Sequence, residues 1–297
     1  GPAANIAPRD LPVALAGPPP ATTVVAAKLA AEHPGAFEIT QVPDAAAADD
    51  LIRDRSVYGA IVVTPAGAEA HVASAAGPVV AQLLGQAAGG GKVVDVVPTY
   101  SGDPRGTGFG AGFLPLAITS LLAGVLLFFA ARTRAARLAG LSTFAVVAGL
   151  AGAGVMQGWL DVLPGDYLTV AGVLALFALA VSGAMTGLAA LLDRGGLALG
   201  AAILFLVGNA LSAVASAPEL LPQPWGEVGQ WLPIGAGATL LRSVVYFDGN
   251  GGLTPALVLS TYAVVGLALV AIGRRGTTRR AAEAIPAAAT PEHALAR

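Results

Sequence analysis

The sequence contains no cysteine and few charged residues. Without cysteine there are no disulfides, no thiolate metal sites and no thiol nucleophile. Charged residues make up 11% of the 297 residues and hydrophobic residues 55%, whereas soluble domains carry about a quarter charged residues. The net charge is −2, and no cluster of Lys and Arg interleaved with aromatics supplies the surface that nucleic acids require. The composition therefore predicts a membrane protein with no nucleic-acid partner.

Signatures of catalysis and of metal binding are also missing. The three histidines, His33, His71 and His293, are isolated, and no spacing matches a zinc site. No Walker motif occurs, so the chain has no ATPase site of that type. Carboxylates are scattered as on solvated helix faces. We predict that the chain is not an enzyme, with no catalytic residues, no cofactor and no bound metal.

The scarcity of charge is uneven along the chain. Residues 1–108 hold ten of the eighteen acidic residues, and apolar stretches of strand and helix type alternate there. We expect residues 1–108 to form a small α/β domain with most strands parallel. The expected strands are 12–17, 37–42, 58–63, 68–74 and 92–98, and the expected helices are 21–33, 44–55 and 78–88.

A glycine-rich stretch at 101–112, SGDPRGTGFGAG, follows this domain. A phosphate-binding loop opens a helix whose N-terminus receives the phosphate, and the helix expected here is a membrane span. We interpret the stretch as a hinge between domain and membrane. Arg105 within it is equally consistent with an anchor for lipid headgroups.

Five runs without charge follow the hinge. The first is 23 residues long, and a helix of that length spans roughly 34 Å, enough to cross a bilayer core. We predict a transmembrane bundle over residues 109–273, packed closely through pairs of glycines four residues apart, such as Gly183 and Gly187. The predicted spans are 109–131, 138–157, 167–192, 197–218 and 256–273.

Arginines orient these spans. Nine of them fall in alternate connections and in the tail, whereas the connections on the other side hold only Arg242. Short cytoplasmic loops carry the excess of Lys and Arg, so we expect residues 1–108 outside and the tail, 274–297, in the cytoplasm and disordered. An external domain needs an export signal, and the sequence shows none. We therefore expect a sixth span before Gly1.

The predicted spans contain no Asp, Glu, Lys, Arg or His, although ion-coupled transporters usually place such a side chain in the bundle. If the protein moves a substrate, the energy then comes from another subunit. Asn209 is the most polar residue within a span. It forms either an interhelical hydrogen bond, which we favour, or a contact with substrate.

The segment 222–247 lies between the last two runs and is too broken by proline to cross a membrane. We predict a re-entrant gate at the outer interface, built of two short helices broken near Pro233. The candidate gate residues are Trp225, Glu227, Trp231, Pro233 and Arg242. Glu227 and Arg242 either pair, or Arg242 binds a phosphate headgroup, or both are ordinary interfacial charges.

Three stretches together resemble permeases of the ABC-2 type exporter family, and also phage-infection-protein-like membrane proteins of actinobacteria. They are LPVALAG at 11–17, FEITQVPDAAAADDLIRDRSVYGAIVV at 37–63 and LPQPWGEVGQWLPIGAGATLLRSVVYFDG at 221–249. The resemblance implies a bacterial plasma-membrane protein with six spans. It also implies a homodimer or a heterodimer with a second permease, driven by a cytoplasmic ATPase subunit, and short helices before the last span that dip into the outer leaflet.

The first expected function is therefore that of a permease subunit exporting a hydrophobic or cell-envelope substrate. Arg132, Arg134 and Arg137 are the candidates for contact with the ATPase, although this connection is short for that purpose. The alternative is a membrane-anchored receptor or scaffold, whose external domain binds an envelope component or a protein without transport. The preference for the permease over the receptor or scaffold rests on analogy of fold.

Overall fold

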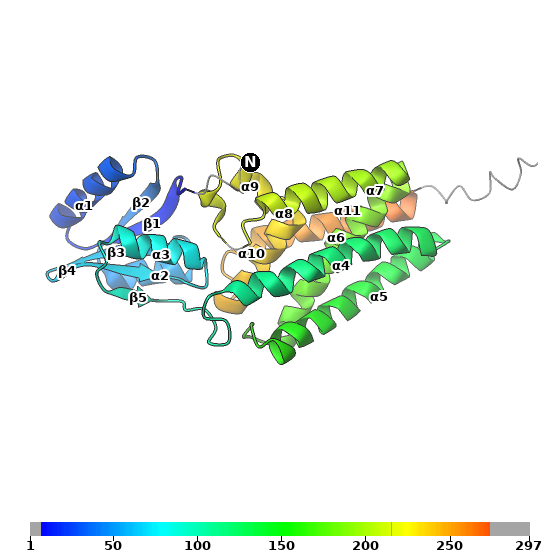
Figure 1. Ribbon diagram of the computed structural model, residues 1–297, viewed down its shortest axis with the longest axis horizontal. Coiled ribbons are helices and arrows are strands. Elements are labelled where there is room, and N and C mark those ends of the chain that lie inside the picture. Colours follow the sequence, from blue (N-terminus) through cyan, green and yellow to red (C-terminus); the bar gives the residue numbers. More distant parts are fainter. Residues whose placement is uncertain (1–6, 215, 274–297) are drawn as a thin grey trace, which may run out of the picture.

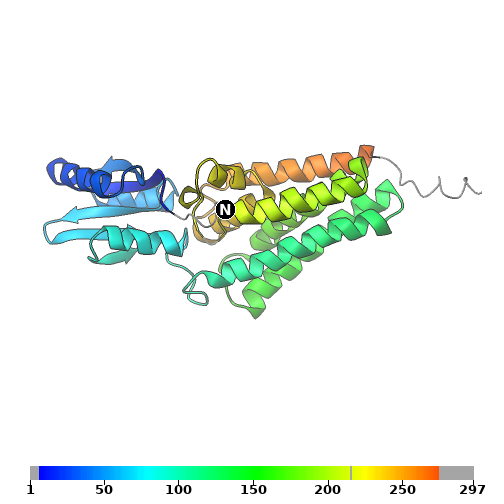
Figure 2. The ribbon, with the colours of Figure 1, turned by 45° about the horizontal axis from the view of Figure 1, so that its top comes forward.

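The computed structural model describes residues 7–214 and 216–273 (Figure 1). The molecule is elongated, with an α/β domain at one end and a helical bundle at the other. In Figure 2, short helical segments and loops lie between the domain and the long helices. The end of the bundle that meets the α/β domain is called the domain end below, and the opposite end is called the far end.

The α/β domain contains a sheet of five strands in the order β2-β1-β3-β4-β5. β1 pairs in parallel with β2 and with β3, and β4 pairs in parallel with β5, whereas β3 and β4 form an antiparallel hairpin. The predicted excess of parallel strands is thus confirmed. The strands are β1 (Leu11–Ala16), β2 (Phe37–Val42), β3 (Gly59–Thr64), β4 (Gly67–Val72) and β5 (Val93–Asp95).

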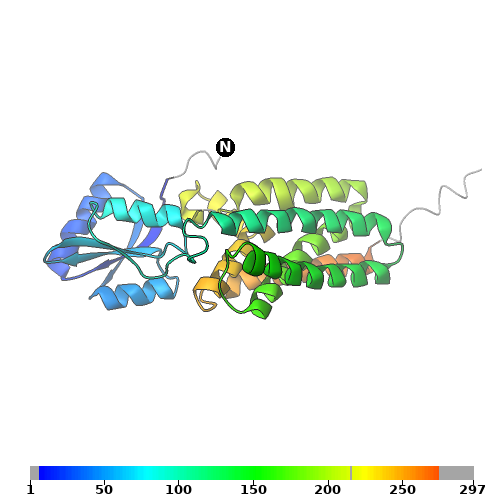
Figure 3. The same cartoon turned by 60° about the horizontal axis from the view of Figure 1, so that its bottom comes forward.

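Three helices cover the two faces of the sheet: α1 (Pro19–Glu32), α2 (Ala45–Arg53) and α3 (Pro78–Ala87). α1 and α3 lie on one face and α2 on the other (Figure 3). β1 is buried on both faces because a parallel strand between helices has no solvated side. Asp44 caps α2 by accepting a hydrogen bond from the backbone N–H of Ala47 at 2.9 Å.

The bundle contains five helices that are long and apolar enough to cross a membrane. Two of them include a π-helical stretch, Gly154–Trp159 at the end of α5 and Ala201–Val207 between α7 and α8. The helical elements are α4 (Thr107–Ala130), α5 (Arg134–Ala153), α6 (Tyr167–Leu192), α7 (Arg194–Gly200), α8 (Gly208–Leu211) and α11 (Leu253–Ile272).

α6 is the central helix of the bundle and is buried over most of its length. Its packing on α11 depends on glycine, because a Cβ on Gly187 would lie 2.7 Å from the carbonyl oxygen of Gly266. A Cβ on Gly266 would lie 2.4 Å from the backbone of Gly183. The close packing predicted for this pair is confirmed at Gly187, whereas a Cβ on Gly183 itself would lie no closer than 3.9 Å to its nearest neighbour.

Two predicted spans have the wrong ends. The fourth was expected over 197–218, but the helix begins at Arg194 and ends at Leu211. Ala213 adopts a left-handed backbone (φ 49°), which ends a right-handed helix. The second was expected to begin at residue 138, but α5 begins at Arg134 and therefore includes Arg134 and Arg137. Arginines therefore do lie in two of the long apolar helices, at their ends.

The chain between α8 and α11 lies at the domain end. It contains a 3-10 turn (Pro218–Leu220), α9 (Trp225–Gln230) and α10 (Pro233–Tyr246). The backbone N–H groups of Ala7 and Arg9 donate to the carbonyls of Leu220 and Glu219 at 3.1 and 3.0 Å. The start of the α/β domain is thus joined directly to this turn.

Candidate functional site at the domain junction

α9 and α10 are the two short helices predicted for the segment before the last long helix. They are separated by Trp231 and Leu232, and Pro233 is the first residue of α10. Proline fits there because the first N–H of a helix has no partner within the helix. α10 packs against α6 so closely that a Cβ on Gly237 would lie 2.4 Å from the ring of Phe177. This helix belongs to the bundle core.

α9 carries the exposed side of the segment. Trp225 is 45% exposed and Trp231 is 64% exposed, and Glu227 is also exposed. Glu227 and Arg242 do not pair, and in the described part of the chain neither forms an ion pair. The predicted pairing is therefore wrong. Glu227 stays at the surface, and Arg242 turns away from it into the protein.

Arg242 is buried, with only 7% of its surface exposed. One guanidinium nitrogen donates to the carbonyl of Val214 at 2.8 Å, and the guanidinium carbon lies 4.9 Å from the centre of the Phe109 ring. Burial lowers the pKa of Arg242 to about 10, so the group stays charged at neutral pH. Arg242 therefore connects α10 to α4 and to the chain after α8. Its guanidinium is buried inside the protein and is not exposed to bind a lipid headgroup.

A second arginine reaches α10 from the α/β domain. Arg55 follows α2 in a left-handed conformation (φ 59°), and its guanidinium donates to the carbonyl of Thr239 at 3.3 Å and to the hydroxyl of Ser243. It also lies 5.0 Å above the ring of Phe247. Burial lowers the pKa of Arg55. This side chain is a direct link between the α/β domain and the bundle.

Glu219 and Tyr58 are the remaining polar residues at this junction beside Arg55 and Arg242. Oε2 of Glu219 is buried and has no hydrogen-bond partner among the described residues. Burial raises the pKa of the Glu219 carboxyl, although Tyr58 and Arg55 act in the opposite direction. Burial, together with the charge of Glu219, also raises the pKa of the Tyr58 hydroxyl. A cavity of 110 Å³ is lined by Arg55, Tyr58 and Glu219 together with neighbours from both domains.

We call Arg55, Tyr58, Glu219 and Arg242 the junction cluster. The sequence interpretation singled out Arg242 alone, because the other three lie in segments far from it in the chain. One signal was available for Glu219, a single carboxylate in the apolar, proline-rich stretch 217–224. Arg55 and Tyr58 both lie shortly before the buried strand β3, a position in the sequence that surface residues also occupy.

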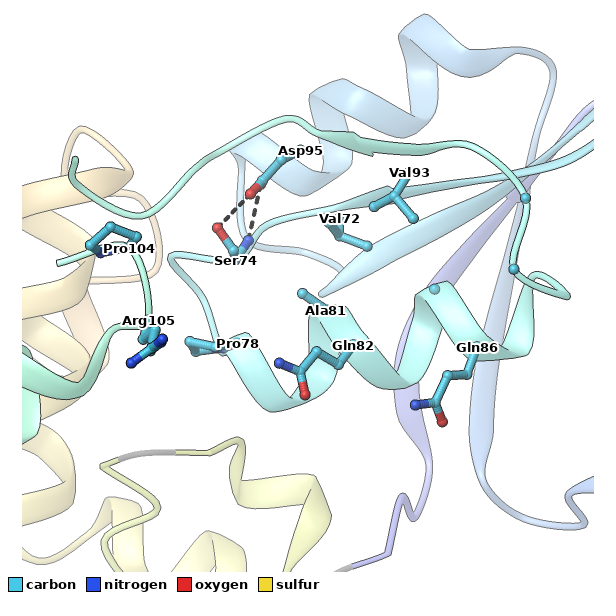
Figure 4. Close-up of a pocket in the computed structure, with 13 residues that line it drawn as sticks. Val72, Ser74, Pro78, Ala81, Gln82, Gln86, Val93, Asp95, Pro104 and Arg105 are labelled. Atoms are coloured by element: carbon cyan, nitrogen blue, oxygen red, sulfur yellow. Dashed lines mark hydrogen bonds between the residues drawn. The ribbon is translucent and has the colours of Figure 1, made fainter.

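A groove of 730 Å³ lies on the α/β domain beside α3 and β5 (Figure 4). Asp95 is held at its edge, because its carboxylate accepts bonds from the hydroxyl and the N–H of Ser74 at 2.5 and 3.1 Å. Arg105 lines the end of the groove nearest the bundle and comes from the connection between β5 and α4. Besides Asp95 and Ser74, the groove is lined by the guanidinium of Arg105 and the amides of Gln82 and Gln86.

The three arginines predicted to contact an ATPase lie at the far end, and they differ in exposure. Arg132 is exposed. Arg134 donates to the carbonyl of Gly273 at 2.7 Å, at the end of α11. Arg137 is buried and donates to the carbonyls of Phe128 and Ala131 at 2.9 and 3.1 Å, at the end of α4. Two of the three therefore satisfy carbonyls at helix ends, and only Arg132 has no such task in the described structure.

Asn209 lies on α8 with its side chain exposed on the surface of the bundle. The expected interhelical hydrogen bond is absent from the described residues, in which the backbone carbonyl of Asn209 accepts a hydrogen bond from the Ser212 hydroxyl at 2.9 Å. The side chain faces outward because α8 contacts its neighbours through Gly208 and Leu211. The favoured interpretation of this residue is therefore wrong.

His71 was taken as an isolated histidine, but its Nδ1 lies 2.6 Å from a carboxylate oxygen of Asp49. This contact joins β4 to α2 inside the α/β domain. No group of three or more His, Cys, Asp or Glu side chains that could hold a metal occurs within residues 7–214 and 216–273. Comparisons of the chain with models of protein families, with curated proteins and with solved structures find no match.

Proposed function

We propose that the five long helices cross a bacterial plasma membrane, with the α/β domain outside and the far end in the cytoplasm. Their length and apolar surface support insertion. The direction is supported by Arg132, Arg134 and Arg194 at the far end and by exposed tryptophans at the domain end, as expected of an interfacial aromatic belt.

The chain then acts as the membrane subunit of an exporter that moves a hydrophobic or cell-envelope substrate outward. One observation carries this proposal: α9 and α10 are too short to cross the membrane, yet α10 is packed into the bundle and tied to the external domain by Arg55. A change in the external domain is thereby transmitted to the outer mouth of the bundle. The resemblance to ABC-2 type permeases supports the same function, as an analogy.

Energy for export comes, in this proposal, from a separate ATPase subunit at the far end. Arg132 is the side chain available for that contact. The end of the last long helix, α11, is held at the same end of the bundle, because Arg134 donates a hydrogen bond to the carbonyl of Gly273. A second copy of the chain or a related permease completes the transporter.

One observation favours the alternative of a receptor or scaffold. Only residues 131–133 separate α4 from α5, and a single residue, Asp193, separates α6 from α7. Connections this short leave little surface for an ATPase to hold. A scaffold needs no such surface and would act through the groove or the junction at its external domain.

Capture of a partner separates the two functions. The chain has no cysteine, so Arg132→Cys provides a single thiol at the far end for a photoactivated cross-linker in native membranes. Export predicts a cross-linked ATPase subunit, with Lys28→Cys in the α/β domain as the matched control that captures none. If the tagged chain purifies from those membranes without any ATPase, and Arg132→Cys captures none, the exporter is contradicted and the scaffold is favoured.

A further inference from the structure

The 3-10 turn Pro218–Leu220 inserts into the α/β domain, although it belongs to the chain between the long helices. Leu220 is completely buried, and Ala217, the residue before the turn, is also buried. Both belong to the hydrophobic cluster that contains Leu11 of β1 and Leu84 of α3. We call residues 217–220 the docking turn, because side chains from the bundle segment complete the core of the α/β domain there.

The hydrogen bonds that hold the docking turn come from a distant part of the chain. The backbone N–H groups of Ala7 and Arg9 donate to the carbonyls of Leu220 and Glu219. The guanidinium of Arg9 donates to the carbonyl of Leu220 at 3.2 Å, across 211 residues of sequence. Such bonds can break while the α/β domain and the bundle each stay folded. Insertion of the docking turn is therefore a separate equilibrium from unfolding.

Glu219 is the one ionisable residue of the docking turn. Its Oε2 atom is buried and has no hydrogen-bond partner in the described part of the chain, and the ion pairs found there do not include Glu219. Burial of a carboxyl group without donors costs more free energy in the charged form than in the protonated form. Ionisation of Glu219 therefore opposes insertion, because water solvates both oxygens once the turn is withdrawn.

Charged and titratable groups surround Glu219 on every element packed at this junction. They are Arg9 before β1, Arg55 after α2, Tyr58 before β3, Glu227 on α9 and Arg242 on α10. Burial has the largest effect and raises the pKa of Glu219. Tyr58 and Arg55 favour the charged carboxylate, whereas Glu227 disfavours it. Arg242 acts on the hydroxyl of Tyr58. The inserted turn therefore holds the proton of Glu219 more tightly than a withdrawn turn does.

We propose that the docking turn is an acid-sensitive switch, which stays inserted in the α/β domain while Glu219 is protonated and withdraws when Glu219 loses its proton. Stabilisation of the inserted state is complete below the ordinary glutamate pKa of about 4.3. It is lost as the pH rises through the higher pKa of the inserted state. Withdrawal separates the α/β domain from the segment that leads into α9 and α10. With this domain outside, as proposed above, the external pH sets the equilibrium, although the switch itself does not depend on that topology.

Thiol labelling of the purified full chain in a mild detergent measures withdrawal. Because the chain has no cysteine, Ala217→Cys places a single thiol in the docking turn, where a methanethiosulfonate reagent reaches it only after withdrawal. Thiolate formation raises the labelling rate with pH in any protein. Each rate is therefore divided by that of a reference chain that carries both Ala217→Cys and Glu219→Gln. We expect this ratio to rise several-fold from pH 5 to pH 8, because only the chain with Glu219 gains the buried charge.

The matched control combines Ala217→Cys with Glu227→Gln, which removes an exposed carboxylate from α9. Its rate, divided by that of the same reference chain, should rise with pH as it does without the second substitution. Loss of the pH dependence in this control would show that nearby negative charge in general, and not the buried carboxyl, drives the change.

Hydrogen exchange of the wild-type chain tests the switch without any substitution. After correction for intrinsic exchange, protection of the Ala7 and Arg9 amides should fall as the pH rises, while protection of Ala14 inside β1 stays constant. A labelling ratio that does not change with pH, or an equal loss of protection at all three amides, overturns the proposal. Neither measurement involves an ATPase, so failure of the switch leaves the export proposal intact, and failure to find an ATPase leaves the switch intact.

Discussion

Both ends of the helical bundle bury arginines, but for different purposes. At the far end, Arg137 donates to carbonyls six and nine residues before it in the chain, which closes the short turn between α4 and α5. At the domain end, Arg55 contacts Thr239, 184 residues away, and Arg242 contacts Val214, 28 residues away. The buried arginine of the far end thus acts locally, although the exposed Arg134 also links α5 to Gly273, 139 residues away. The arginines of the domain end all join distant parts of the chain.

This difference indicates where movement is possible. Local contacts at helix ends break only when the helices themselves unfold. Contacts between separate segments can be exchanged while each segment stays folded, and conformational changes use such interfaces. The junction cluster also contains an unsatisfied carboxylate oxygen on Glu219, which lowers the stability of the docked arrangement. The domain end is therefore the end suited to a change of state, and the following predictions test that contrast.

The largest effect is expected for Arg242→Ala. The substitution leaves the carbonyl of Val214 without its donor and removes the cation from the face of Phe109, which should lower the free energy of unfolding by about 3 kcal/mol. Thermal unfolding in detergent, followed by tryptophan fluorescence, measures the loss. Arg132→Ala is the control, because that side chain is exposed. Equal melting temperatures for the two variants would show that the buried guanidinium contributes nothing.

Arg137→Ala should have the next largest effect, about 2 kcal/mol, because two carbonyls at the end of α4 lose their donor. The far end should fray while the α/β domain stays docked. Hydrogen exchange would then rise in residues 126–137 but not in α10. A rise in α10 of the same size would contradict the local character of the far end.

Arg55→Ala should loosen the α/β domain from α10 at an expected loss of about 1.5 kcal/mol. The amides of Thr239 and Ser243 should exchange faster, and protease should cut the connection at 98–106 sooner, while the β-sheet stays protected. The matched control is Arg53→Ala, since the side chain of Arg53 forms an exposed ion pair with Asp50 at 3.2 Å, and such pairs contribute little. Identical proteolysis of the two variants would exclude Arg55 as the link.

Glu219→Gln should have the smallest effect, visible mainly as a change in pH dependence. Burial raises the pKa of Glu219 in the folded protein, so the folded state holds this proton more tightly than the unfolded state does. The resulting stabilisation is complete below the unfolded value of about 4.3 and is lost as the pH rises through the folded pKa. Melting temperatures from pH 4 to 7.5 should fall less for Glu219→Gln than for the wild type. If the melting temperatures of the two proteins changed equally with pH, the raised pKa of Glu219 would be contradicted.

The sequence was informative wherever a residue acts within its own segment. Long runs without charge predicted the five apolar helices, alternating apolar stretches predicted the strands, and Pro233 predicted the break between α9 and α10. Helix ends were less accurate. Arg134 and Arg137 lie inside α5 because their guanidinium groups donate hydrogen bonds to carbonyls at the ends of α11 and α4. The hydropathy of the sequence does not predict these hydrogen bonds.

The candidate site was predictable only in part. Arg242 stood out as a single charge in an apolar segment, but its partners Val214 and Phe109 are set by packing and could not be read from the sequence. Glu227 was a reasonable partner by distance along the chain, yet it lies on the exposed side of α9. The prediction for Asn209 rested on its polarity alone. In the structure Asn209 lies on the exposed face of α8.

The central claim is that the two ends of the bundle face opposite sides of a membrane and perform different tasks. Single-cysteine labelling tests it most directly, since the wild-type chain has no cysteine of its own. Lys28→Cys on exposed α1 and Arg132→Cys at the far end are treated, in intact cells, with a thiol reagent that cannot cross membranes. We predict that Lys28→Cys is labelled at once and Arg132→Cys only after the cells are permeabilised. Labelling of both cysteines in intact cells, or of Arg132→Cys alone, would contradict the account.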